Sequence, residues 1–138
     1  MVRVNLLNPK KLSDQHLIAE YNEILMLVAY IRKYTSLDNI PKNYCLGKGH
    51  MRFFKNKLLY LKKRHELLKK EIKKRGFVAK KSISLSKFKK ELVKDWRASS
   101  DDRKIIKKRL IEKLSLKPEF YRYYSEYKSK KFFIELLR

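Results

Sequence analysis

SDQHLIAEYNEILMLVAYIRK, residues 13–33, is the stretch that most clearly predicts the fold. Its apolar side chains recur every three or four residues, which is the spacing of one face of an α-helix. They are Leu17, Ile18, Tyr21, Ile24, Leu25, Val28 and Ile31. Ser13 and Asp14 are typical residues at the beginning of a helix. We therefore expect a helix that runs to about Lys33 and buries this apolar face.

The same helix carries a polar strip. His16, Glu20 and Glu23 are separated by four and three residues, so their side chains lie along one side of the helix. A glutamate on a helix surface is usually only solvated. The spacing alone therefore assigns no function to Glu23.

Two further segments have helical spacing. The pattern predicts one long helix from about His50 to Arg75, ended by Gly76. A third helix is expected to begin near Ser100 or Asp101, where acidic residues suit a helix amino end, and to run through Leu114.

The remaining segments are expected to be mostly irregular. Residues 35–49 have the proline and glycines of a connecting loop, and residues 78–100 are mixed, with a short helical piece in SKFKKELVKDW at 86–96. The chain has only 3 glycines and 3 prolines, which disfavours a many-stranded fold. We predict an all-α fold, a single compact domain over 1–138 with about three main helices and long irregular connections. Residues 125–138 are a candidate additional C-terminal tail.

The charge is strongly unbalanced. The sequence contains 37 Lys and Arg against 14 Asp and Glu, a net charge of +23. Such a surface favours a polyanion partner, and nucleic acid is the first candidate because binding it releases condensed counterions. An acidic membrane surface, contacted by the tail KSKKFFIELLR at 128–138, is an alternative. A general enrichment in lysine without a partner is another.

Other features exclude several classes of protein. A single cysteine, Cys45, cannot form an internal disulfide or a zinc cluster, so we expect a reduced, intracellular protein without a metal site. The longest apolar run, residues 24–31, is too short to span a membrane, which predicts a soluble protein. His65 interrupts the apolar face of the second helix, and a structural role is favoured over a catalytic one.

Four stretches resemble the phage-type pyrimidine-dimer DNA glycosylase with AP-lyase activity, the endonuclease V of UV-damage repair. They are RVNL at 3–6, LSDQHLIAEYNEI at 12–24, LGKGHMRFFKNKLLYLKKRHELLKKEIKKRGF at 46–77 and RLIEKLSLKPEFYRYY at 109–124. The resemblance implies a three-helix fold in which the amino terminus reaches the active site between helices. Residues 78–100 match poorly.

The resemblance also implies the catalytic groups. The nucleophile would be the main-chain amine of Val2, exposed by removal of Met1, where the phage enzyme has threonine. An α-amine has an ordinary pKa of about 7.7 to 8.0, so a substantial fraction is unprotonated near neutral pH. Glu23 matches the catalytic glutamate. The amine would form a Schiff base with the sugar C1′ and β-elimination would follow, without a metal or an organic cofactor.

Further matches imply contacts with DNA. The expected DNA-binding residues are Arg3, Gln15, His16, Asn22, Arg109, Lys113, Tyr121, Arg122, Tyr123 and Tyr124. The chain has Asn22 and Met26 where the phage enzyme has arginines. The expected partner is double-stranded DNA containing UV photoproducts or abasic sites, bound by a monomer.

Two alternatives remain open on the sequence. One is the same scaffold acting on another damaged base, or on abasic sites only. The other is a noncatalytic basic helical protein that binds DNA or RNA, for which Glu23 and a free amino end would be dispensable.

Overall fold

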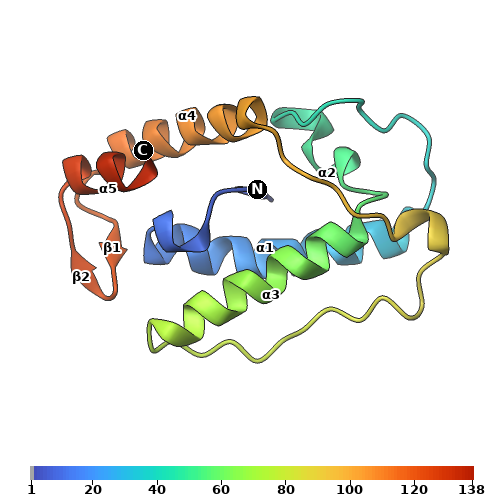
Figure 1. The fold of residues 1–138 in the computed structure, drawn as a ribbon, viewed down its shortest axis with the longest axis horizontal. Helices are drawn as coiled ribbons and strands as arrows, with labels where there is room; N and C mark the ends of the chain where they lie inside the picture. Colours follow the sequence, from blue (N-terminus) through green and yellow to red (C-terminus); the bar gives the residue numbers. More distant parts are fainter. Residues whose placement is uncertain (1) are drawn as a thin grey trace.

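The computed structural model describes residues 2–138, and it confirms the all-α class and the single compact domain (Figure 1). The α-helices are α1 Asp14–Lys33, α2 His50–Phe53, α3 Leu58–Lys74, α4 Ser100–Leu116 and α5 Lys130–Leu137. The short 3-10 helices are η1 Pro9–Lys11, η2 Gly47–Gly49 and η3 Lys90–Leu92. A small antiparallel hairpin joins β1 Arg122–Tyr123 to β2 Glu126–Tyr127.

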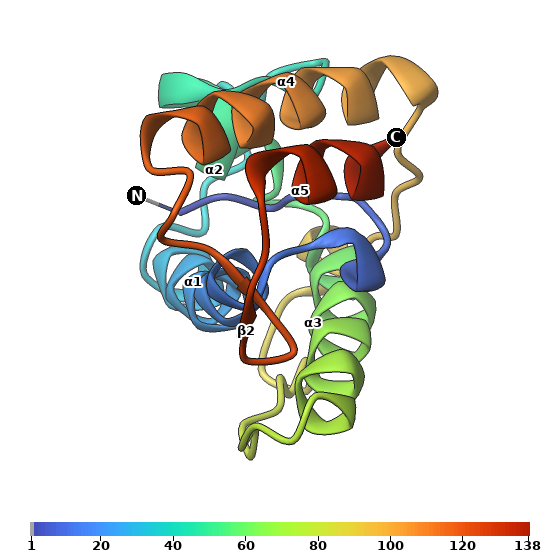
Figure 2. The same ribbon diagram turned by 90° about the vertical axis from the view of Figure 1, so that its left-hand side faces the viewer.

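Two layers of helices enclose the amino-terminal segment. α1 and α3 pack side by side in one layer, and α4 and α5 form the other (Figures 1 and 2). The segment before η1 runs between the layers. Its residues Val2 and Val4 belong to the same core as Leu17, Ile24 and Leu61, so both valines are buried between the layers.

α1 begins where the sequence predicts. The Ser13 hydroxyl accepts a hydrogen bond from the His16 N–H, as an N-cap should, and the helix ends at Lys33. The capping of α4 is equally clear, because Ser99 and Asp102 form a reciprocal capping box.

The prediction of one helix from about His50 to Arg75 is wrong between Phe54 and Lys57. There the helix is interrupted, and the Lys57 backbone forms an antiparallel bridge with Val93. The Lys57 ammonium also donates to the Phe53 carbonyl at 2.7 Å. The break lets two consecutive phenylalanines, both buried, pack edge-on against the ring of Trp96. Gly76 follows the end of α3 with a positive φ, as predicted.

The later segments differ from the expectation in detail. The helical piece expected within 86–96 is only the single turn η3. The final stretch KSKKFFIELLR contains α5, whose Phe133 and Leu137 are buried against the rest of the core. Within residues 2–138, no helix is both long and apolar enough to cross a membrane.

Candidate active site

The amino-terminal segment is extended, and its side chains alternate between two environments. Val2 and Val4 are buried in the core, with exposed fractions of 5% and 0%. Arg3 and Asn5 line a cavity of about 130 Å³ between this segment, α1 and α4. This alternation is the ordinary consequence of an extended backbone.

Glu23 of α1 reaches this segment directly. Its Oε1 accepts a hydrogen bond from the Arg3 backbone N–H at 2.9 Å. The nitrogen of Val2 is separated from the nitrogen of Arg3 by the Val2 Cα and carbonyl carbon alone. The carboxylate of Glu23 therefore lies beside the backbone of Val2 and Arg3.

The cavity brings together several residues predicted from the sequence. Its polar lining residues are Arg3, Asn5, His16, Glu20, Glu23, Arg109 and Lys113. His16 and Glu23 come from the polar strip of α1, where they are seven residues, or about two turns, apart. Arg109 and Lys113 come from α4, where they are about one turn apart. The cavity thus has carboxylates on one wall and cations on the other.

The charges in this cavity perturb one another. Burial lowers the pKa of the Arg3 guanidinium, and the positive charge of Arg109 lowers it further. Burial, then Arg109 and Lys113, lowers the pKa of His16 to about 4. The imidazole is therefore neutral at neutral pH, and its Nδ1 is hydrogen-bonded to the Ser13 hydroxyl.

Glu23 has the opposite environment. Burial raises the pKa of its carboxyl, and the hydrogen bond from the Arg3 N–H offsets part of that rise. A carboxyl with a raised pKa is better suited to accept and return protons near neutral pH than an exposed one. This perturbation, in a cavity, is typical of a functional group.

The Val4 peptide is fixed from both sides by residues that sequence reasoning missed. The Val4 N–H donates to His50 Nε2 at 2.9 Å, and the Tyr44 hydroxyl donates to the Val4 carbonyl at 3.0 Å. His50 Nδ1 is 2.9 Å from the Cys45 carbonyl, so Nδ1 carries the proton and Nε2 is the acceptor. Burial lowers the pKa of His50 to about 4, which keeps this tautomer neutral.

The backbone is next held at Leu7, by an arginine that also forms a buried ion pair. Arg64 of α3 donates from Nε and Nη2 to the two carboxylate oxygens of Glu20, at 2.7 and 2.9 Å. Its Nη1 donates to the Leu7 carbonyl. Leu6 has a φ of +60°, and the Leu7 N–H bonds back to the Asn5 carbonyl at 2.6 Å. This γ-turn directs the chain away from the cavity.

A second buried arginine, Arg75, connects α3 to η1 and to the beginning of α1. Arg75 donates to the carboxylates of Asp14 and Glu71 at 3.0 and 2.9 Å and to the Pro9 carbonyl at 3.1 Å. Asp14 also accepts the backbone N–H groups of Tyr124 and Ser125, the two positive-φ residues of the hairpin turn. This network fixes the hairpin against the beginning of α1.

The other sequence-predicted DNA contacts lie outside the cavity. Gln15 uses its amide on the backbone, accepting from Arg122 N–H at 2.9 Å and donating to the Phe120 carbonyl at 3.1 Å. Tyr121 is buried and stacks on His16, with ring centroids 4.8 Å apart. Asn22 is exposed on α1.

The remaining members of the aromatic stretch belong to the hairpin. The Arg122 side chain is exposed and lies over the ring of Tyr127. The Tyr123 hydroxyl donates to the Lys10 carbonyl, and the ring of Tyr124 lies 5.1 Å from the Arg75 guanidinium. These contacts give the two tyrosines structural partners within the protein.

His65 has a structural environment, as the sequence favoured. It is buried, and its ring stacks on Tyr21 with the centroids 4.4 Å apart. It does not line the cavity.

A comparison with protein families identifies the family of this chain. The model of the family described as pyrimidine dimer DNA glycosylase matches residues 1–85. The matched part contains Arg3, His16 and Glu23, as well as the anchors His50 and Arg64, whereas the cations of α4 lie beyond it. The chain therefore belongs to the pyrimidine dimer DNA glycosylase family, which acts in the repair of UV-damaged DNA.

Proposed function

We propose that this protein is a bifunctional pyrimidine-dimer DNA glycosylase and AP lyase, acting as a monomer, in which the α-amine of Val2 attacks the sugar. The observation that carries the proposal is the 2.9 Å hydrogen bond between the Arg3 N–H and Glu23 Oε1. It positions a carboxylate with a raised pKa beside the nitrogen of the preceding residue, Val2.

The proposal requires a free amine on Val2. Removal of Met1, which lies outside the described residues, would expose it. An ordinary α-amine has a pKa of about 7.7 to 8.0, and neighbouring cations lower such values by like-charge repulsion. Arg3 is adjacent in sequence, and Arg109 lines the same cavity. The amine would therefore be sufficiently unprotonated to act as a nucleophile at neutral pH.

The chemistry follows from two groups. The Val2 nitrogen forms a bond to C1′ while the C1′–base bond breaks, and the base leaves with the bonding electrons. Glu23 accepts the proton that the amine loses and returns it to O4′ as the C1′–O4′ bond opens, which gives a Schiff base. The imine acidifies the 2′ proton, and its loss expels the 3′ phosphate and breaks the strand.

The cations of the cavity support the same reaction. Arg3, Arg109 and Lys113 can bind the phosphates on either side of the damaged nucleotide, because they line the cavity next to Glu23. Such contacts fix the register of the DNA and carry no sequence preference. The neutral His16 imidazole can form hydrogen bonds to sugar or phosphate without adding charge.

The deciding experiment is borohydride trapping. Tag-free protein, verified by intact mass to begin at Val2, is reduced in the presence of duplexes carrying a thymine dimer, an abasic site or no lesion. We expect covalent adducts on the first two duplexes, with the modified peptide beginning at Val2. The matched control is the same protein with residues left before Val2, which should give no adduct there.

Each other outcome has a meaning. An adduct on a lysine would refute the role of the Val2 amine. Trapping on the abasic duplex alone would leave a lyase with another lesion as its substrate. Trapping on neither duplex would favour the noncatalytic DNA-binding alternative.

One observation favours testing other lesions as well. Asn22 and Met26 are both exposed on α1, near the glutamate, and neither carries the positive charge found in the resembling phage enzyme. The rate of strand cleavage should therefore be compared across several damaged bases with Met26→Arg as the paired variant. A dimer-specific gain in this variant would indicate that the parent has a shifted preference.

A further inference from the structure

A second concave surface lies between η1 and α3. It is a groove of about 330 Å³, and three lysines line it: Lys10 from η1, and Lys70 and Lys74 from α3. All three side chains are exposed. We call this surface the η1–α3 groove. None of the residues that line this groove also lines the amino-terminal cavity.

The positive charge of the groove is not neutralised within the protein. In the part of the chain that the structure describes, none of these lysines forms an ion pair within 4.0 Å. The groove contains one carboxylate, Glu71, and the buried Arg75 guanidinium already binds it at 2.9 Å. The groove therefore presents three lysine charges to solvent.

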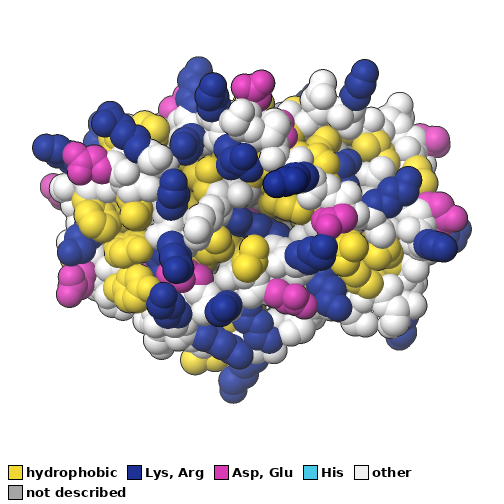
Figure 3. All heavy atoms as spheres, in the orientation of Figure 1, with side chains coloured by type: hydrophobic (Ala, Val, Ile, Leu, Met, Phe, Trp, Pro, Cys, Tyr) yellow, Lys and Arg dark blue, Asp and Glu magenta, His cyan; other side chains and the backbone are white. Residues whose placement is uncertain are grey.

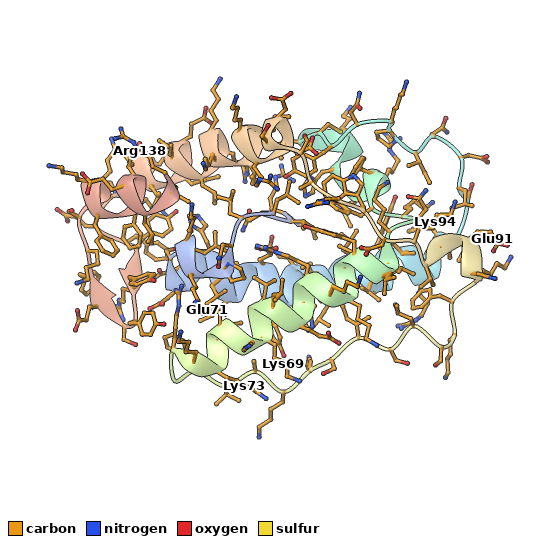
Figure 4. The ribbon with its side chains drawn as sticks, viewed as in Figure 1. Lys69, Glu71, Lys73, Glu91, Lys94 and Arg138 are labelled. Atoms are coloured by element: carbon orange, nitrogen blue, oxygen red, sulfur yellow. The ribbon has the colours of Figure 1, made fainter. Side chains whose placement is uncertain are left out.

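α3 also carries lysines outside the groove. Lys69 and Lys73 project from the side of α3 that faces away from η1, whereas Glu71 projects toward η1 (Figure 4). Figure 3 shows many Lys and Arg side chains over one face of the molecule, with Asp and Glu side chains interspersed among them. Lys70 and Lys74 are one helical turn apart, about 6 Å along the axis. Duplex DNA carries one negative charge per about 1.7 Å, so it would present several phosphates to this length.

The cavity and the groove are formed by different elements. The cavity is lined by the amino-terminal segment, α1 and α4, whereas the groove is lined by η1, the residue before it and α3. In Figure 2, α1 lies on one side of the molecule, and η1 and α3 lie on the other. Duplex DNA is stiff, with a persistence length of about 50 nm, so a short duplex does not wrap around a domain of this size without a large deformation. Two surfaces on opposite sides would therefore contact two segments of DNA.

We propose that the η1–α3 groove is a second DNA-binding surface, which holds the phosphates of an undamaged duplex segment while the cavity engages another. Lys10, Lys70 and Lys74 are the binding residues. The surface contributes no chemistry, and the proposal does not depend on the Val2 mechanism. Its consequence is that one molecule can bridge two duplex segments and stay near DNA during a search for damage.

The test is a bridging assay with undamaged DNA. A biotinylated duplex on beads, incubated with the protein, should capture a second, fluorescent duplex. Replacing the three lysines together, Lys10→Ser, Lys70→Ser and Lys74→Ser, should reduce this capture about tenfold or more. The dependence of capture on salt should also become weaker in this variant, with a slope smaller in magnitude than that of the parent by about 2.7, the value for three phosphate contacts. Replacing the same lysines by arginine should preserve capture.

The matched control removes the same charge elsewhere. Lys87, Lys89 and Lys90 are also exposed lysines, and their replacement by serine should leave capture within about twofold of the parent. Equal losses in the two serine variants would show that net charge alone is responsible and would overturn the proposal. Unchanged capture in the groove variant would also overturn it. So would sedimentation showing that bridging follows self-association of the protein.

Discussion

The amino-terminal segment and the exposed face of α3 that lines the groove differ in the surroundings of their polar groups. The first is buried, and individual side chains bind its backbone: Glu23 at Arg3, His50 and Tyr44 at Val4, and Arg64 at Leu7. The second is exposed, and among the described residues its groove lysines, Lys70 and Lys74, form no ion pair.

This difference suits two functions, the positioning of a reacting group and the binding of a polyanion. A reacting amine needs a position defined to a fraction of an ångström, which hydrogen bonds in a buried environment provide. Holding a polyanion needs only a density of charge, which long solvated side chains provide. Substitutions should therefore have large, residue-specific effects at the amino-terminal segment and small, roughly additive effects on the stability of the α3 face.

The largest effect is expected for Glu23→Gln. If Glu23 transfers protons as proposed, strand cleavage should fall by about 10²- to 10⁴-fold while duplex binding stays close to that of the parent. Single-turnover cleavage and a binding titration on the same dimer-containing duplex measure both quantities. Glu112→Gln, at an exposed position of α4, is the control and should cleave normally. Equal cleavage by Glu23→Gln and the parent would refute the role of Glu23.

The stability of Glu23→Gln distinguishes a loss of catalysis from a loss of folding. Burial raises the pKa of Glu23 in the folded protein above its ordinary value, so its contribution to stability is present at low pH and is lost as pH rises through the folded pKa. Glu23→Gln should therefore have a slightly higher melting temperature than the parent at pH 7 and the same one at low pH. A large loss of stability would instead mean that cleavage failed through misfolding.

The next effect is on the anchor at Leu7. Arg64→Met leaves the buried Glu20 carboxylate without its partner, and breaking such a pair costs about 3–5 kcal/mol. Denaturant unfolding should show this loss. Arg97→Met, at an exposed arginine, should change the free energy of unfolding by less than about 0.5 kcal/mol. Adding Glu20→Leu to Arg64→Met should recover part of the loss, and no recovery would contradict the ion-pair explanation.

A smaller effect, dependent on pH, is expected at His50. Its folded pKa is lowered to about 4, so its contribution to stability is full above about 6.5 and is lost as pH falls from there toward 4. Over this window the free energy of unfolding of the parent should fall by up to about 3 kcal/mol more than that of His50→Gln. The amide oxygen of glutamine can still accept the Val4 N–H. Parallel pH curves for the two proteins would refute the neutral-acceptor role.

The smallest effect on stability is expected on the α3 face. Because Lys70 and Lys74 are exposed and unpaired, each replacement by serine should change the free energy of unfolding by no more than about 0.5 kcal/mol. Thermal unfolding of the single variants checks this value. A loss comparable to that of Arg64→Met would mean that these lysines stabilise the fold and are not free to bind a polyanion.

The sequence predicted the parts of the fold that depend on local periodicity. The apolar spacing in 17–31 and the caps at Ser13 and Gly76 determine α1 and the end of α3 within a few residues. The break after Phe53 was missed because it depends on a bridge to Val93, far along the chain. Periodicity cannot reveal such a contact, and the Tyr124–Ser125 turn, which lacks glycine, gave no turn signal either.

The candidate site was predictable only in its chemistry-bearing residues. The motif identified Arg3, His16 and Glu23, and the structure brings them to one cavity. His50 and Tyr44 carry no local signal, because they bind buried backbone groups of Val4, which lies 46 and 40 residues away from them. The buried backbone groups of an extended segment without a neighbouring strand must find such side-chain partners.

The alternation of Val2, Arg3, Val4 and Asn5 also fixes how many residues this segment can have. One residue inserted after Arg3 would exchange the two sides of the extended chain, so that Arg3 or Asn5 would have to enter the core in place of a valine. The hydrogen bond of Arg3 to Glu23 and those of Val4 to His50 and Tyr44 could then not form at the same time. The number of residues between Val2 and α1 therefore cannot change without loss of buried contacts. An insertion in this segment should lower the free energy of unfolding far more than a substitution.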